Sequence, residues 1–302
     1  MLFHPSRQYG NDMLLKAATD AVAAAVSTKF PLDEVLGPEL SRLISISASV
    51  VKRHGILIEK AIFEALVTSG RYEVLHNATI PITAAADGLV ASNTAESLAR
   101  LNLRYDQPAA RSVNHDLIVI DAAAGWAGAY SVKRGNGDMG PRLRKPLERD
   151  VAAVRLLLRS FLRDQGYSTV DVVTSACIDW FGNAGLPPHL TVQGPDVDAH
   201  FGVPVVATVE RMTGHLRNAL HQTMPGLLTP LLRHFASLEP VLTSPAQKVA
   251  DPDVNAEEGR REPTAKPQVD AIHPIGPDAL RRTASSRTHA SISAGLRANG
   301  QR

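Results

Sequence analysis

Two short segments carry the residues most capable of chemistry. An apolar, strand-like run follows Asp116, and a second apolar run ends at Lys133 after a short Gly-containing turn. The pattern predicts a β-hairpin; if it turns about Ala123 or Ala124, Lys133 falls opposite His115 or Asp116. A carboxylate and an amine that converge where two strands splay apart are suited to phosphodiester hydrolysis. That reaction needs a cation held by oxygen ligands, an activated water and a positive group near the phosphorus.

The elements around the hairpin would position these groups. Glu59 lies beside the apolar stripe of a long helical pattern and is the candidate for a further metal-side or water-positioning carboxylate. From residue 40 onward the periodicities predict the order helix, strand, strand, strand, helix, strand. These six elements are expected at about residues 40–69, 71–83, 117–120, 129–133, 147–166 and 170–178. We therefore expect an α/β fold with a mixed sheet of four or five strands and helical flanks.

This combination resembles the restriction-endonuclease-like superfamily, whose signature is Pro-Asp, a variable gap and Asp/Glu-x-Lys on such a core. The resemblance covers about residues 45–180. It implies Asp116 and Glu59 as metal-binding carboxylates, Lys133 as the group that stabilises charge or orients the water, Mg²⁺ as cofactor, and DNA as substrate. Its expected activity is that of a metal-dependent endonuclease.

The sequence departs from the superfamily signature at two positions. His115 stands where proline is usual, which is a mild change, whereas Ser131 replaces the second carboxylate. A neutral hydroxyl is a poor magnesium ligand, so the departure at Ser131 leaves activity open. Four other acidic residues are candidates to replace the lost carboxylate, and the sequence selects none of them: Asp121, Asp138, Glu148 and Asp150.

Basic residues concentrate between positions 133 and 163. Arg155, Arg159 and Arg163 recur every four residues and so share one helix face, and Arg134 follows the hairpin lysine. Such a stripe is expected to follow a phosphate backbone by charge alone. An ordinary solvated helix face explains the stripe equally well.

Other interpretations stay open for the predicted site. Taken singly, Asp116 opens a strand, Lys133 ends one and Glu59 faces solvent; only their joint arrangement favours a site. The alternative function is a non-catalytic module that keeps the scaffold and binds nucleic acid or a protein partner.

Composition bounds the remaining possibilities. The chain has 302 residues, 44% of them hydrophobic, with 32 Lys+Arg against 30 Asp+Glu, so its total charge does not indicate a nucleic-acid binder. No secretory signal or membrane span is evident, which predicts a cytoplasmic protein without membrane contact. The single cysteine, Cys177, is expected to be a small buried hydrophobe, and a catalytic thiol is the alternative.

Three regions are expected along the chain. Residues 1–39 form an N-terminal helical extension that serves as a lid or in a homodimer. Residues 40–240 form the nuclease-like α/β domain. In residues 241–302 the composition shifts to Pro, Ala, Ser, Arg and Asp, which predicts a disordered tail.

Overall fold

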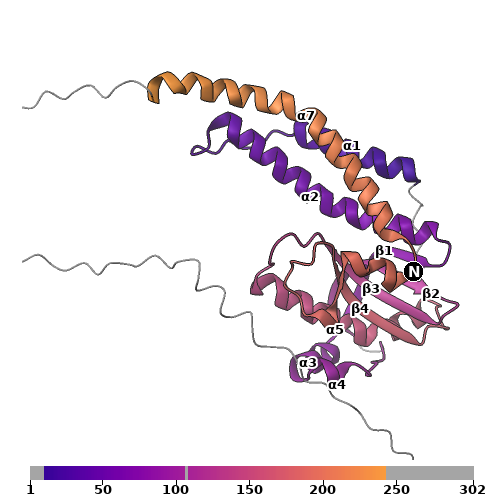
Figure 1. The fold of residues 1–302 in the computed structure, drawn as a ribbon. Coiled ribbons are helices and arrows are strands. Elements are labelled where there is room, and N and C mark those ends of the chain that lie inside the picture. Colours follow the sequence, from indigo (N-terminus) through magenta and orange to yellow (C-terminus); the bar gives the residue numbers. More distant parts are fainter. Residues whose placement is uncertain (1–9, 106–107, 243–302) are drawn as a thin grey trace, which may run out of the picture. The chain divides into compact units, whose positions relative to one another are not determined.

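The computed structural model describes residues 10–105 and 108–242. Within this part, a five-stranded sheet lies between two helical layers (Figure 1). The side chains of β1 (Glu73–Thr83), β2 (Ala109–Asp121), β3 (Trp126–Lys133) and β4 (Val172–Asp179) contribute to both buried clusters. The architecture is therefore α/β with a mixed sheet, as predicted.

The strands are ordered β1-β2-β3-β4-β5, where β5 is Thr191–Gln193. The first three strands form antiparallel pairs, and β4 and β5 add parallel to β3. The parallel β3–β4 step needs a crossover, which the helix α5 (Pro141–Asp164) provides. The chain thus contains the helix, three strands, helix and strand expected from residue 40 onward.

Three long helices cover one face of the sheet: α1 (Asn11–Ser27), α2 (Gly37–Thr68) and α7 (Val205–Leu242). They share a buried cluster with side chains of β1 to β4, and the short helix α6 (Val197–Phe201) contributes Val197 and Phe201 to it. Because α1 packs on both α2 and α7, it belongs to the same compact unit as the sheet.

The opposite face is covered mainly by α5. Its apolar side recurs with helical period, and eight of its residues are buried. Two short helices, α3 (Ala84–Ser92) and α4 (Ala95–Leu98), connect β1 to β2 on this side (Figure 1). The helix α3 was not predicted, since Asp87-Gly88 indicates a turn; Thr83 caps it by accepting a hydrogen bond from the Ala86 N–H.

One prediction about the last helices is wrong. In the sequence, apolar residues at helical spacing predict two helices, at about 206–220 and 226–240, and Pro230 weakens the second. The structure has one helix instead, because α7 continues through Pro225 and Pro230. A proline inside a helix removes a backbone hydrogen bond, and packing of Leu216, Leu227 and Leu231 offsets this cost.

Most of the predicted tail, residues 243–302, lies outside the described residues. Among those that are described, no helix has an apolar stretch long enough to cross a lipid bilayer.

Candidate functional site

The sheet separates between β2 and β3 at the point where the predicted charges meet. The β2–β3 ladder runs from Asp121–Trp126 to Leu117–Tyr130 and stops there, although β2 continues paired to β1 and β3 to β4. Beyond the last pair, the Asp116 carboxylate accepts the Val132 N–H through Oδ2 at 2.5 Å. The side chain of Asp116 therefore takes the place of a β2 carbonyl at the split.

A backbone irregularity accompanies this split. Leu75 and Ala78 of β1 belong to the same buried apolar cluster, the one that includes the buried side of α5, and so do Val113 and Ile118 of β2. In a regular strand, residues an odd number of positions apart point to opposite faces of the sheet. The alternation thus changes phase in both strands, near Asn77, whose φ of 54° is left-handed. An asparagine between two strand-like runs indicates a bulge or turn, and the irregularity of the structure falls at this residue.

The hairpin register differs slightly from the prediction. The turn is centred between Ala123 and Ala124, as expected, but continuation of this register places Lys133 opposite Asn114. The predicted contact survives because the strands have parted: Lys133 Nζ lies 3.8 Å from Asp116 Oδ2. The predicted aspartate and lysine are therefore brought together by the split.

Glu59 of α2 joins Asp116 and Lys133 in a cluster of charged side chains at the split, which we call the charged cluster. Its Oε1 lies 2.6 Å from Nε2 of His76, which is paired with Leu117 in the β1–β2 ladder. Burial raises the pKa of Asp116, Lys133 and the Val132 N–H oppose that rise, and Glu59 adds to it. The two carboxylates are thus close enough to repel each other.

His76 was not singled out from the sequence. It also influences the Asp116 carboxylate electrostatically, and its ring packs against Phe63 with centroids 5.4 Å apart. Only the β1–β2 register, which puts His76 beside the position after Asp116, could have indicated it. The sequence does not encode that register in any local motif.

Ser131 does not take part in the charged cluster. Its side chain is buried, and it is paired with Cys177 of β4. Burial also raises the pKa of the Cys177 thiol to about 12, which agrees with a small buried hydrophobe and argues against a nucleophile.

The four candidate replacements for the missing carboxylate have other contacts. Asp121 caps the hairpin turn through the Ala124 N–H and pairs with Arg71. The other three form salt bridges with arginines of α5 or β2: Asp138 and Glu148 with Arg144, and Asp150 with Arg111. Of the acidic residues considered from the sequence, Asp116 and Glu59 are therefore the two that meet at the split.

These two carboxylates suit Mg²⁺ as a partial ligand set. Magnesium in proteins commonly takes one or two carboxylates and completes its octahedron with water and substrate phosphate oxygens. The repulsion between Asp116 and Glu59 is the feature a cation would relieve. In the part of the chain that the structure describes, however, no group of three or more His, Cys, Asp or Glu side chains is arranged to hold a metal.

The arginines of the predicted stripe are bound by groups of the fold itself. Arg155 donates to the backbone oxygens of Leu98, Ala99 and Leu101, and thereby anchors the segment after α4. Arg159 and Arg163 both bind Asp171, with nitrogen–oxygen distances of 2.7 and 2.6 Å. The three arginines share a helix face as predicted, but their described contacts are structural.

Arg134 differs from the stripe. Its Nε donates to Nδ1 of the buried His54, and its guanidinium lies 5.1 Å from the ring centroid of Phe181. Burial, assisted by Arg134 and Arg217, lowers the pKa of His54 to about 4, so the imidazole is neutral and can accept this hydrogen bond. Arg134 is thus held in place by a neutral partner and keeps its charge.

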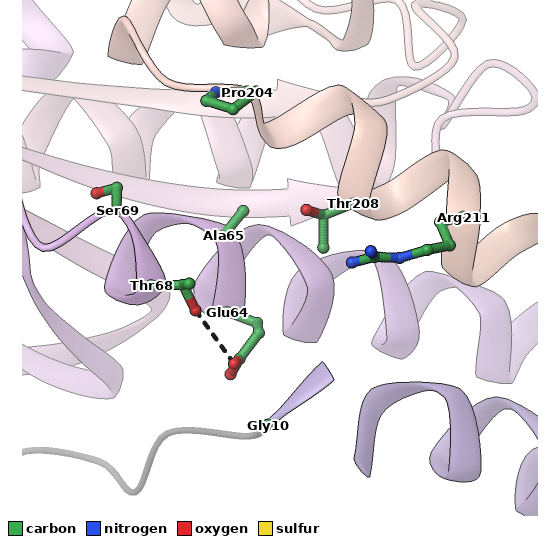
Figure 2. A pocket seen from close by; sticks show the side chains of 8 residues that line it. All are labelled: Gly10, Glu64, Ala65, Thr68, Ser69, Pro204, Thr208 and Arg211. Carbon is green, nitrogen blue, oxygen red and sulfur yellow. Dashed lines mark hydrogen bonds between the residues drawn. The ribbon is translucent and has the colours of Figure 1, made fainter. Parts of the chain in front are cut away.

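A separate pocket of about 430 Å³ lies between the C-terminal end of α2 and the start of α7 (Figure 2). It contains a carboxylate and a guanidinium, those of Glu64 and Arg211, and Thr68 donates a hydrogen bond to Glu64. None of the predicted site residues lines it. The pocket and the split in the sheet are therefore distinct features.

Comparisons of this chain with protein-family models, with curated proteins and with solved structures gave no match. The resemblance to the restriction-endonuclease-like superfamily therefore stays a prediction.

Proposed function

We propose that this protein is a Mg²⁺-dependent nuclease that hydrolyses DNA at the split between β2 and β3. The observation that carries the proposal is the convergence of Asp116 and Lys133 there, 3.8 Å apart, with the Glu59 carboxylate close enough to act on Asp116. Two carboxylates beside one amine form the minimum set for binding a cation and stabilising the charge that develops on a phosphate.

Each residue has a distinct role in this proposal. Asp116 and Glu59 would hold the ion, which supplies Lewis-acid polarisation of the scissile phosphate when bound. Both described contacts of the Asp116 carboxylate use Oδ2, which leaves Oδ1 for a ligand. His76 orients Glu59 through their 2.6 Å contact, and Lys133 stabilises the developing negative charge or orients the attacking water.

Cleavage of plasmid and single-stranded DNA tests this assignment. The wild-type protein is incubated with Mg²⁺, with Mn²⁺ and with a chelator, beside Lys133→Ala and a matched control, Lys16→Ala, whose ammonium pairs with Asp20 at an exposed position of α1. We expect cleavage that needs a divalent cation, falls about 100-fold or more in Lys133→Ala, and is unchanged in Lys16→Ala. Cleavage at equal rates in both variants contradicts the proposal.

A second candidate is a non-catalytic nucleic-acid-binding module with the same scaffold. It is favoured by Ser131 at the usual carboxylate position and by the lack of a three-residue metal-binding group among the described side chains. Salt-sensitive DNA binding with no cleavage under any divalent cation would support this module in place of the nuclease.

A further inference from the structure

An exposed aromatic ring lies beside the proposed site. Phe181 follows the end of β4, and 44% of its surface is accessible. Its backbone is held in place, because its N–H donates to the Arg134 carbonyl and the preceding Trp180 N–H donates to the Lys133 carbonyl. The ring is thus presented by an ordered segment and not by a loose loop.

The Arg134 guanidinium lies against this ring and gives it a positive neighbour. The two groups are 5.1 Å apart, within the range of a cation–π contact. Arg134 forms no salt bridge with a described carboxylate, and its Nη1 is buried with no acceptor among the described residues. Phe181 and Arg134 together form an aromatic surface with an uncompensated positive charge, which we name the Phe181 platform.

The platform adjoins the charged cluster along two elements. Lys133 precedes Arg134 directly and is paired with Asp179, two residues before Phe181. On α2, a side chain at Gly55 would meet Cβ of Arg134 at 3.7 Å, and Glu59 lies one helical turn beyond Gly55. The platform therefore borders the split where Asp116, Glu59 and Lys133 meet.

We propose that the Phe181 platform stacks on an unpaired base of a DNA strand whose phosphate lies at Lys133, so that the site acts on single-stranded DNA. This inference rests on the proposed function for its substrate. An aromatic ring can stack on a base only when the face of that base is open, and a duplex closes both faces. The positive charges of Arg134 and Lys133 complement the adjoining phosphates.

Binding in the absence of divalent cations tests the platform apart from catalysis. Fluorescence anisotropy with a labelled oligothymidylate and with a duplex of equal length is measured in chelator for the wild type, Phe181→Ala and Phe181→Trp. We expect Phe181→Ala to weaken single-strand binding by about 5- to 150-fold, the range for loss of one base–aromatic stack, and Phe181→Trp to restore it. Duplex binding should change less than about twofold in either variant.

Phe235→Ala serves as the matched control, because Phe235 is half exposed on α7 and is not part of the platform. A 2-aminopurine base in the oligonucleotide gives an independent readout, since its fluorescence falls on stacking and this loss should disappear in Phe181→Ala. Circular dichroism and thermal melting verify that each variant is folded.

The outcomes separate the two proposals. The platform proposal is overturned if the wild type does not bind single-stranded DNA, or if Phe181→Ala weakens the binding of single-stranded and duplex DNA equally. The nuclease proposal is then still tested by the cleavage assay. Loss of single-strand binding in Phe181→Ala without any metal-dependent cleavage supports the platform and contradicts the nuclease.

Discussion

The split between β2 and β3 and the arginine face of α5 both concentrate charge, but they use it differently. At the split, Asp116, Glu59 and Lys133 come from three elements and remain partly accessible. On α5, Arg159 and Arg163 share Asp171, and Arg155 binds three backbone carbonyls. The charges of the first region belong to the proposed site, whereas those of the second hold segments of the fold together.

This difference shows what residue spacing can and cannot indicate. A four-residue repeat places arginines on one helix face, but it does not show which acceptors lie opposite that face. The comparison predicts that substitutions at the split change chemistry and substitutions on α5 change stability.

The largest expected effect is a loss of cleavage activity that follows substitution at the split but not substitution on α5. Glu59→Gln removes one metal-side carboxylate charge but retains a hydrogen-bond acceptor for His76, and we expect metal-dependent cleavage to fall about 100-fold. Arg159→Ala, on the α5 face, should change the rate less than about threefold. Initial rates at saturating Mg²⁺ measure both, and similar losses in the two variants would remove the distinction between the regions.

The next effect is the pH dependence of stability that His54, the partner of Arg134, should produce. The pKa of His54 is lowered from 6.5 to about 4 in the folded protein, so its contribution to stability is present above pH 6.5 and is lost as the pH falls through about 4. Between pH 7 and 4.5 we expect the free energy of unfolding to fall by up to about 3 kcal/mol from this group. Urea denaturation of the wild type and His54→Gln measures it; the same pH dependence in both would exclude this role.

A smaller effect tests the structural use of charge on α5. Arg155→Ala leaves the carbonyls of Leu98, Ala99 and Leu101 without their guanidinium donor, and the free energy of unfolding should fall by about 1–3 kcal/mol. Lys16→Ala, which breaks an exposed pair, should cost less than about 0.5 kcal/mol. Equal stability of the two variants in urea would show that Arg155 does not anchor this segment.

The smallest expected effect is a gain of DNA affinity on the arginine face of α5. Asp171→Asn removes the shared partner of Arg159 and Arg163, so the α5 face regains free positive charge. Non-specific DNA affinity at low salt should rise about threefold, and binding should become more sensitive to salt. Filter binding at salt concentrations from about 50 to about 200 mM measures the affinity and its salt dependence. An unchanged dependence on salt would show that Asp171 does not mask the charge of Arg159 and Arg163.

Periodicity predicted most of the fold correctly, because each element buries one apolar face. The stripe of α2, the alternation of β1 and the buried runs of β2, β3 and β4 all appear near the expected residues. The errors have physical causes. Tertiary packing holds α7 together through Pro225 and Pro230, and a threonine cap starts α3 where Asp87-Gly88 indicated a turn.

The candidate site was predictable only in part. The residue types and the hairpin indicated that Asp116 and Lys133 would meet, but the register is one residue or more from the prediction, and the split in the sheet compensates for it. The roles of His76 and Phe181 depend on contacts across strands and between distant segments, which no local motif encodes.

The most direct test of the account is the rate of DNA cleavage by Asp116→Asn with Mg²⁺. This variant keeps an oxygen that can accept the Val132 N–H but removes the negative charge at the split. The account predicts a folded protein with an unchanged melting profile whose cleavage is at least about 100-fold slower than that of the wild type. Cleavage by Asp116→Asn at the wild-type rate, still dependent on Mg²⁺, would contradict it.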